Sequence, residues 1–250
     1  MSDELNLLVL TAFLGFCRIG ACFIVMPGLS SARVPTQIRL FVAVAITLAL
    51  LMNLSGFIRP AVDRNPNTLL LLIGSELLVG TLIGLTARIY TLALSFIGQG
   101  IATLVGYGAV GGTAIEENEP QAPLASIISL AALLLLFSLD FHHEVVRALV
   151  ESYQVIPVET LFDPQGALVD LGDTMRDAFM VMLRLGSPFI AYAILVNVAI
   201  GFVNKLTPQI PVYFISLPFV IAGGMLLLYF GASTFLTLFG DAFMPVTIGR

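Results

Sequence analysis

Long apolar runs with few charged residues are the feature that most restricts how this chain folds. They cover residues 5–26, 38–58, 68–112, 124–139, 185–203 and 212–239. A helix needs about 20 apolar residues to cross the hydrocarbon core of a bilayer, and most of these runs are long enough. Apolar residues make up 58% of the chain and charged residues 11%, far from the composition of a soluble domain. We therefore predict an all-α integral membrane protein with five or six hydrophobic segments.

The charged residues exclude one class of partner and leave the orientation open. A formal net charge of -5 provides no basic surface for nucleic acid. The basic residues are spread thinly over loops that would lie on alternating sides of a membrane, so the positive-inside rule favours no orientation. Residues 1–4 include two acids and no basic residue, whereas a targeting peptide begins with basic residues, and we expect the first apolar run to stay in the mature protein.

The run over residues 68–112 is too long for one crossing. Its second part, from Gly98 onward, is rich in glycine, and we expect a first helix followed by a short, glycine-broken one. Residues 98–112 would span only about 22 Å as a helix, less than the hydrocarbon thickness. Non-helical backbone at such depth is tolerated where it is buried in protein or lines a watery cavity. This segment is therefore predicted to contact partner subunits or a pore.

An acidic stretch follows, with three glutamates and no basic residue between Thr113 and Pro123. Two interpretations stay open for it. It is either an exposed loop or a mobile lid at a passage, since glycine-rich flanks permit movement. The residues by themselves favour the exposed loop.

One stripe in the same run combines charge with glycine. Glu76, Gly80, Gly84 and Arg88 recur every four residues and so share one slowly rotating helix face. A GxxxG pattern lets a second helix approach closely, and charged residues in an apolar helix normally face a partner or a cavity. Pairing between helices is the favoured interpretation, and an ion or proton pathway is the alternative.

The two histidines lie in an amphipathic stretch within a more polar region, residues 140–184. One predicted face carries Asp140, His143, Glu144, Arg147 and Glu151, and the opposite face carries His142, Val145, Val146, Leu149 and Tyr153. On this pattern the histidines diverge, and neither HExxH nor Cys/His spacing accompanies them. We expect no metal site. His143 is expected to bond within the charged stripe and His142 to pack in an apolar contact, with a titrating role near neutral pH left open.

Prolines and a glycine, which interrupt helices, mark the remaining connections. Pro157, Pro164 and Gly166 predict an extramembrane turn that precedes an entering helix. Further on, Pro208 and Pro211 oppose a continuous helix after the lone Lys205. The second connection is either a plain loop or a tight hairpin embedded among neighbours.

Several short patches occur in a specific order along the chain. They comprise Arg18, Pro27, Val34, Pro35, Arg39, Glu76, Gly80, Gly84, Gly98, Gln99, Gly106, His142, His143, Ser152, Pro157, Lys205, Pro208, Gln209, Pro218 and Gly223. This series resembles the FliR family of flagellar biosynthetic proteins, whose close relatives serve injectisome-type type III secretion systems. Phe141, Pro211 and Ser216 depart from residues frequent in that family and leave the branch open. The length, the loop spacing and residues 98–120 favour the flagellar branch.

The resemblance implies a single membrane domain over residues 1–250, built of helical hairpins with broken and re-entrant helices. It implies a place in an export gate of the bacterial inner membrane, at the flagellar basal body, through which unfolded substrates pass. The implied partners are FliP-like, FliQ-like and FlhB-like subunits, together with membrane lipid. No enzymatic activity and no cofactor are expected.

The resemblance also assigns roles to residues. The implied plug of the closed pore comprises Gly106, Tyr107, Gly108, Gly111, Gly112, Ile115, Glu116, Glu117 and Pro120. From the residue pattern itself, helix packing and intramembrane polar contacts are expected of Arg18, Glu76, Gly80, Gly84 and Arg88. Structural roles fall to Pro27, Pro35, Arg39, His142, His143, Lys205, Pro208, Gln209 and Pro218. The helix that carries the histidines would then be scaffold.

Two other functional classes compete with this interpretation. Glu76, Arg88 and the histidines are compatible with a proton-coupled transporter that acts alone. An intramembrane hydrolase is disfavoured, because the sequence contains no GxSxG motif, no HExxH motif and no paired aspartates on facing apolar helices.

Overall fold

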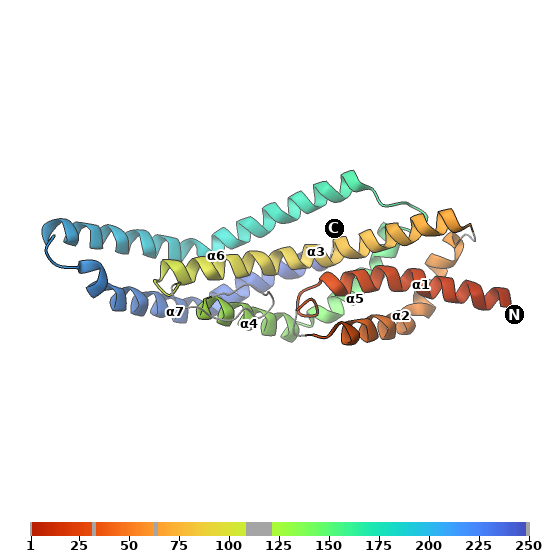
Figure 1. The fold of residues 1–250 in the computed structure, drawn as a ribbon, viewed down its shortest axis with the longest axis horizontal. Coiled ribbons are helices and arrows are strands. Elements are labelled where there is room, and N and C mark those ends of the chain that lie inside the picture. Colours follow the sequence, from red (N-terminus) through yellow and green to blue (C-terminus); the bar gives the residue numbers. More distant parts are fainter. Residues whose placement is uncertain (1, 32–33, 63–64, 109–121, 249–250) are drawn as a thin grey trace. The chain divides into compact units, whose positions relative to one another are not determined.

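The described part of the chain consists mainly of long helices (Figure 1). The computed structural model describes residues 2–31, 34–62, 65–108 and 122–248, and no strand occurs among them. In order, the elements are α1 (Ser2–Val25), α2 (Thr36–Ile58), the short 3₁₀ helix η1 (Arg59–Ala61), α3 (Pro66–Leu104), α4 (Pro123–Ser138), α5 (Phe141–Val155), α6 (Pro164–Leu206) and α7 (Val212–Ile248). The predicted all-α class is confirmed.

Five of the helices are long and apolar enough to cross a membrane, namely α1, α2, α3, α6 and α7. Together α4 and α5 pass the same test, but a bend of 64° separates them, so they are a broken span or a re-entrant pair. The prediction of five or six hydrophobic segments is confirmed, and the chain is a multi-pass membrane protein.

Proline sets several helix starts. Pro66, Pro123 and Pro164 are the first residues of α3, α4 and α6. Proline suits this position because its missing N–H would have no partner inside the helix and its φ angle is already helical. The same missing donor explains the stop between α6 and α7, where residues 207–211 include Pro208 and Pro211 and are exposed.

The predicted break at Gly98 is wrong. Helix α3 runs without interruption for 39 residues, through Gly98 and Gly100 to Leu104. Gly106 terminates the helix two residues after Leu104, because its φ of 84° is the left-handed conformation that glycine adopts without steric penalty. There the N–H of Gly106 donates to the carbonyl of Thr103 and the N–H of Tyr107 to the carbonyl of Ala102, at 3.0 and 2.7 Å. These two bonds form a Schellman cap, which ends a helix at such a glycine.

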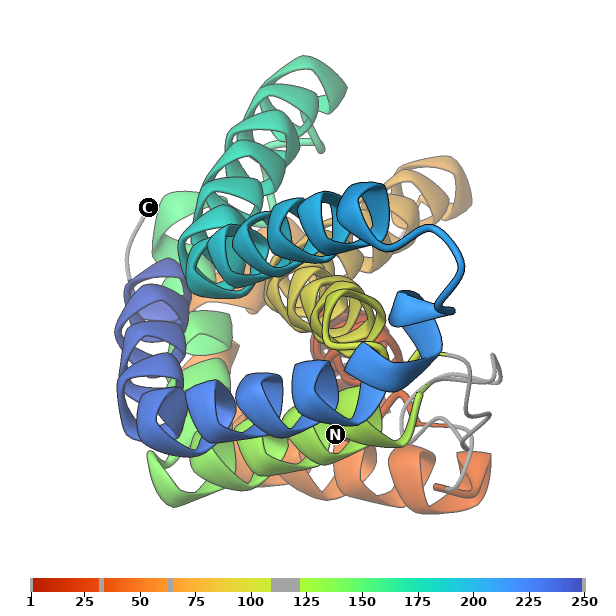
Figure 2. The same ribbon diagram turned by 90° about the vertical axis from the view of Figure 1, so that its left-hand side faces the viewer.

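The helices gather into two compact units. One comprises residues 1–90, 140–175 and 244–250, and the other residues 91–139 and 176–243. In the second unit, the last turns of α3 lie between α4, α6 and α7 (Figure 2), where Ile97 packs against Gly186 and Val105 against Gly224.

In the first unit, α1 is the central helix. In its most apolar window, 56% of the residues are buried inside the chain, against 6% for α7. Helix α1 packs along α2 and also touches α3 backbone to backbone. A Cβ atom added at Gly80 would overlap the carbonyl oxygen of Arg18, and one added at Gly84 would lie 2.6 Å from the carbonyl oxygen of Cys22. The face of α3 that carries both glycines is therefore the face against which α1 packs.

This contact predicts that one added methyl group destabilises the protein at Gly80 but not at a glycine of α3 that has open space around it. Gly80→Ala should lower the free energy of unfolding by roughly 1–3 kcal/mol, because α1 must move away from α3. The matched control is Gly74→Ala, two turns earlier in α3, where an added Cβ meets nothing within 4 Å. Thermal unfolding of the purified protein in detergent, followed by far-ultraviolet circular dichroism, should show a lower Tm for the first variant only. Equal Tm values for the two variants would contradict the close contact.

Candidate functional site

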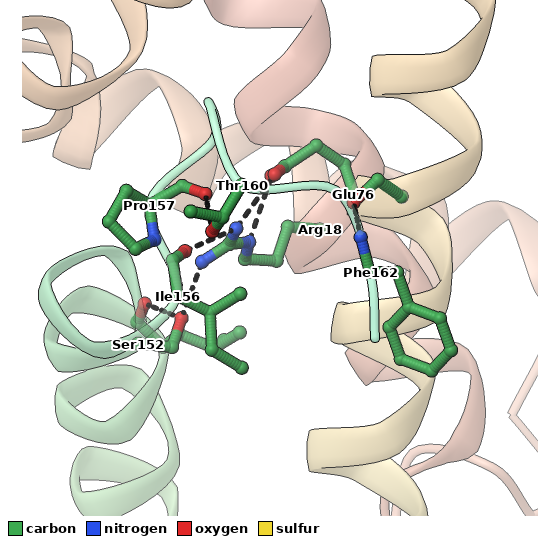
Figure 3. A network of polar contacts seen from close by, with 9 residues as sticks. Arg18, Glu76, Ser152, Ile156, Pro157, Thr160 and Phe162 are labelled. Atoms are coloured by element: carbon green, nitrogen blue, oxygen red, sulfur yellow. Dashed lines mark hydrogen bonds and ion pairs between the residues drawn. The ribbon is translucent and has the colours of Figure 1, made fainter. Parts of the chain in front are cut away.

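A fully buried arginine is the centre of the polar interior in the first unit. Arg18 lies in the apolar helix α1, and its side chain meets Glu76 of α3 (Figure 3). The guanidinium donates from Nε to Oε2 at 2.8 Å and from Nη2 to Oε1 at 2.7 Å. Both side chains are 1% exposed, so this bidentate ion pair is shielded from water. Paired geometry of this kind is the strongest form of arginine–carboxylate contact.

The end of α5 supplies the other contacts of the guanidinium. Nη1 donates to Oγ of Ser152, and Nη2 also donates to the carbonyl of Ile156, both at 3.0 Å. The ring of Tyr153 lies against the guanidinium, with Cζ 3.9 Å from the ring centroid, a cation–π contact. One cation thus joins α1, α3 and the C-terminal end of α5.

The segment after α5 has a second attachment to α3. The N–H of Phe162 donates to Oγ of Ser75, the residue before Glu76, at 2.9 Å (Figure 3). Between these anchors, the carbonyl of Pro157 accepts from the hydroxyl and the N–H of Thr160, which closes a turn. The connection from Ile156 to Phe162 is therefore held at both ends by polar groups of α1 and α3.

The sequence pattern contained only part of this network. It identified Glu76 as a residue that faces a partner, but it assigned no partner to Glu76. The structure places Arg18 there and leaves Arg88, three turns further along α3, half-buried. Tyr153 was expected only on the apolar face, and the acceptor at Ile156 is a backbone carbonyl, which no side-chain pattern signals. The sequence held one clue to these contacts, namely that Ser152 and Tyr153 lie beside the apolar residues of this stretch.

The expectation that the two histidines diverge is wrong. His142 is not buried in an apolar face, because its side chain is 46% exposed, and that of His143 is 73% exposed. Their ring centroids lie 4.2 Å apart. Nδ1 of His143 lies 3.6 Å from Oδ1 of Asp140, in line with the contact to an acid expected for it. The apolar face of α5 is instead formed by Phe141, Val145, Leu149 and Tyr153.

The candidate plug falls largely outside the described residues. Gly111, Gly112, Ile115, Glu116, Glu117 and Pro120 lie there, whereas Gly106, Tyr107 and Gly108 directly follow α3. Both flanks of the segment are held in the second unit. On one side Gly106 faces Leu217 of α7, and on the other Oε1 of Gln99 accepts the N–H of Ala122 at 2.9 Å.

Most of the residues expected to have structural roles occupy turns or helix ends, and Pro218 lies within α7. Pro27 is buried in the turn after α1, and Pro35 precedes α2. Arg39 donates from Nη2 to the carbonyls of Ser31 and Val34, at 2.6 and 2.9 Å, and so closes the turn before α2. Exposed positions hold Lys205 at the end of α6, Pro208 and Gln209 in the following turn, and Pro218 inside α7.

A double-mutant cycle tests the ion pair. Arg18→Met or Glu76→Leu alone should lower the free energy of unfolding by about 3–5 kcal/mol, because each leaves an uncompensated buried charge. The double variant should unfold at a higher temperature than either single variant, since an apolar pair replaces both charges. Arg147→Met is the control, because its partner Glu151 and Arg147 itself are exposed. Additive losses in the double variant would refute the coupling.

Comparison with known proteins assigns the chain to a family. The family model described as bacterial export proteins, family 1, matches residues 9–246. The chain is 26% identical over 238 residues to a flagellar biosynthetic protein FliR from Caulobacter vibrioides, covering 94% of this chain and 93% of that protein. It is 27% identical to FliR of Bacillus subtilis over 85% of this chain and 82% of that protein, and 26% identical to FliR of Escherichia coli over 84% and 80%. The resemblance inferred from the sequence is confirmed, and the chain belongs to family 1 of the bacterial export proteins.

Proposed function

We propose that this chain is a core subunit of the flagellar type III protein export gate in the bacterial inner membrane. It helps to form the channel through which unfolded flagellar proteins leave the cell during assembly of the flagellum. The observation that carries the proposal is the family match over residues 9–246, supported by relatives named flagellar biosynthetic proteins. Those names favour the flagellar branch over the injectisome branch as the system that this chain serves.

The uneven burial of the helices supports a subunit that packs against other proteins. Helix α7 exposes large apolar and aromatic side chains, which include Phe214, Phe219, Tyr229 and Phe230. Only 6% of its most apolar window is buried inside the chain. FliP-like and FliQ-like subunits would cover such faces, with a FlhB-like subunit at the entrance and lipid on the remaining surface.

The proposed mechanism is passive guidance with a gate, and no catalytic group takes part. Residues 106–120 would hold the channel shut between passages, assisted by neighbouring apolar side chains, since a hydrophobic constriction blocks ions by excluding water. The described flanks suit this role. The cap at Gly106 and the bond from Ala122 to Gln99 hold the two ends of the segment on rigid helices.

A stand-alone proton-coupled transporter is less well supported. Both carboxylate oxygens of Glu76 already accept hydrogen bonds from Arg18, as expected of a structural contact between helices. Proton transport by the purified single chain in liposomes would favour the transporter instead.

Removal of the gate segment should open the channel to ions. Deletion of residues 107–118 from the assembled complex should increase ion leakage across the inner membrane while the subunits still assemble. Membrane conductance or dye-reported ion flux in cells measures this effect. The control changes exposed acids elsewhere, Asp170→Asn with Asp173→Asn at the start of α6, and should leave leakage unchanged. Unchanged leakage with normal export in the deletion variant would refute the gate role.

The partner assignment has its own test. Purification of the tagged chain in mild detergent, followed by mass spectrometry, should recover FliP-like and FliQ-like proteins in fixed proportion. Recovery of a monomer surrounded only by lipid and detergent would refute the assembly.

A further inference from the structure

We propose that Asp140, His142 and His143 form a binding site for a divalent transition-metal ion, with Zn²⁺ as the reference ion. The site lies where α4 ends and α5 begins. One ligand atom from each of the three residues lies within 4.8 Å of the other two. The export role gives the two histidines a structural part only and assigns no ligand to them, and the inference is independent of that role.

The backbone at the break explains why the three side chains converge. Asp140 has a φ of 57°, the left-handed conformation, and it is the one non-glycine residue with positive φ in the described part of the chain. Such a conformation carries a steric cost for a residue with a Cβ atom, and aspartate is among the residues that tolerate it best. Although Asp140 is the residue before α5, its carboxylate makes no capping bond to the helix. The carboxylate instead points toward the imidazoles, with Oδ1 at 3.6 Å from Nδ1 of His143 and 4.0 Å from Nε2 of His142.

The two distances from Asp140 are close to those of an occupied site, and the ligand atoms of the two histidines lie within 4.8 Å of each other. Zn²⁺ binds histidine nitrogen and carboxylate oxygen at about 2.0–2.2 Å, so neighbouring ligands of a tetrahedral ion are about 3.3–3.6 Å apart. The Asp140–His143 distance already has this value. The Asp140–His142 distance needs a contraction of about 0.5 Å, which side-chain rotation supplies at an exposed position. The sequence argument against a metal site rested on the 100° separation of adjacent residues on one helix; in the structure the centroids of the two imidazoles nevertheless lie 4.2 Å apart, and Asp140, which precedes α5, adds a third ligand.

The donor set selects the class of ion. Two imidazole nitrogens and one carboxylate oxygen suit Zn²⁺, Cu²⁺ and Ni²⁺, whereas Ca²⁺ and Mg²⁺ require oxygen ligands. Three protein ligands leave at least one position for water or for a group from a partner.

The surrounding charges favour a cation. Glu144 adds a second carboxylate directly after His143, and its Oε2 is buried with no hydrogen-bond partner among the described residues. Arg147, the next basic residue along α5, is engaged by Glu151 at 3.4 Å. A bound ion would connect Asp140 to the first turn of α5.

Zinc titration of the untagged full-length protein in detergent tests the site. Isothermal titration calorimetry should show one saturable site in the unchanged protein, and Asp140→Asn, His142→Ala and His143→Ala should each weaken its affinity tenfold or more. Glu151→Gln, an exposed acid on the same helix, is the matched control and should bind as the unchanged protein does. Zn²⁺ should also raise the Tm of the unchanged protein and of the control, because a ligand specific for the folded state stabilises it.

A second measurement identifies the ligands. Electron paramagnetic resonance of bound Cu²⁺ should show coupling to two imidazole nitrogens, and each histidine variant should lose one of them. Absence of saturable Zn²⁺ binding, equal affinity in all variants, or a preference for Ca²⁺ would overturn the proposal. In those cases the cluster is a hydrogen-bonded surface group only.

Discussion

The fold of the first unit depends on a guanidinium group that has no access to water. An unpaired charge in such surroundings is strongly destabilising, so Arg18 requires acceptors at fixed positions. Glu76, Ser152 and the carbonyl of Ile156 supply them from three separate parts of the chain. The need to satisfy one cation therefore determines where α3 and the end of α5 lie around α1.

The ion pair and the close contact of the helix backbones support each other. Glu76 precedes Gly80 by one helical turn on the same face of α3, and the carbonyl of Arg18 itself touches Gly80. Without the glycines, α1 would stand further from α3 and the carboxylate would lie too far away for two short bonds. Packing between apolar helices gains little from the hydrophobic effect in a membrane, so close contact and buried polar bonds provide much of the specificity.

In the second unit, hydrogen bonds hold the described residues on either side of residues 109–121. The left-handed cap at Gly106 ends α3 sharply, and a single side-chain bond from Gln99 holds the start of α4. The described residues on both sides of the segment are therefore fixed by hydrogen bonds.

Apolar run lengths and prolines determined most of what was predictable from the sequence. The number of hydrophobic segments, the starts of α3, α4 and α6 and the stop between α6 and α7 follow from local chemistry, because helix length in lipid and the missing N–H of proline act within a few residues. The pattern also indicated that Glu76 faces a partner. The tertiary structure decided that this partner is Arg18, 58 residues away, that α3 continues past Gly98 and that the two histidines converge at Asp140. These outcomes depend on which surfaces meet in space and on one backbone angle at a helix break, and residue periodicity along a single helix contains neither.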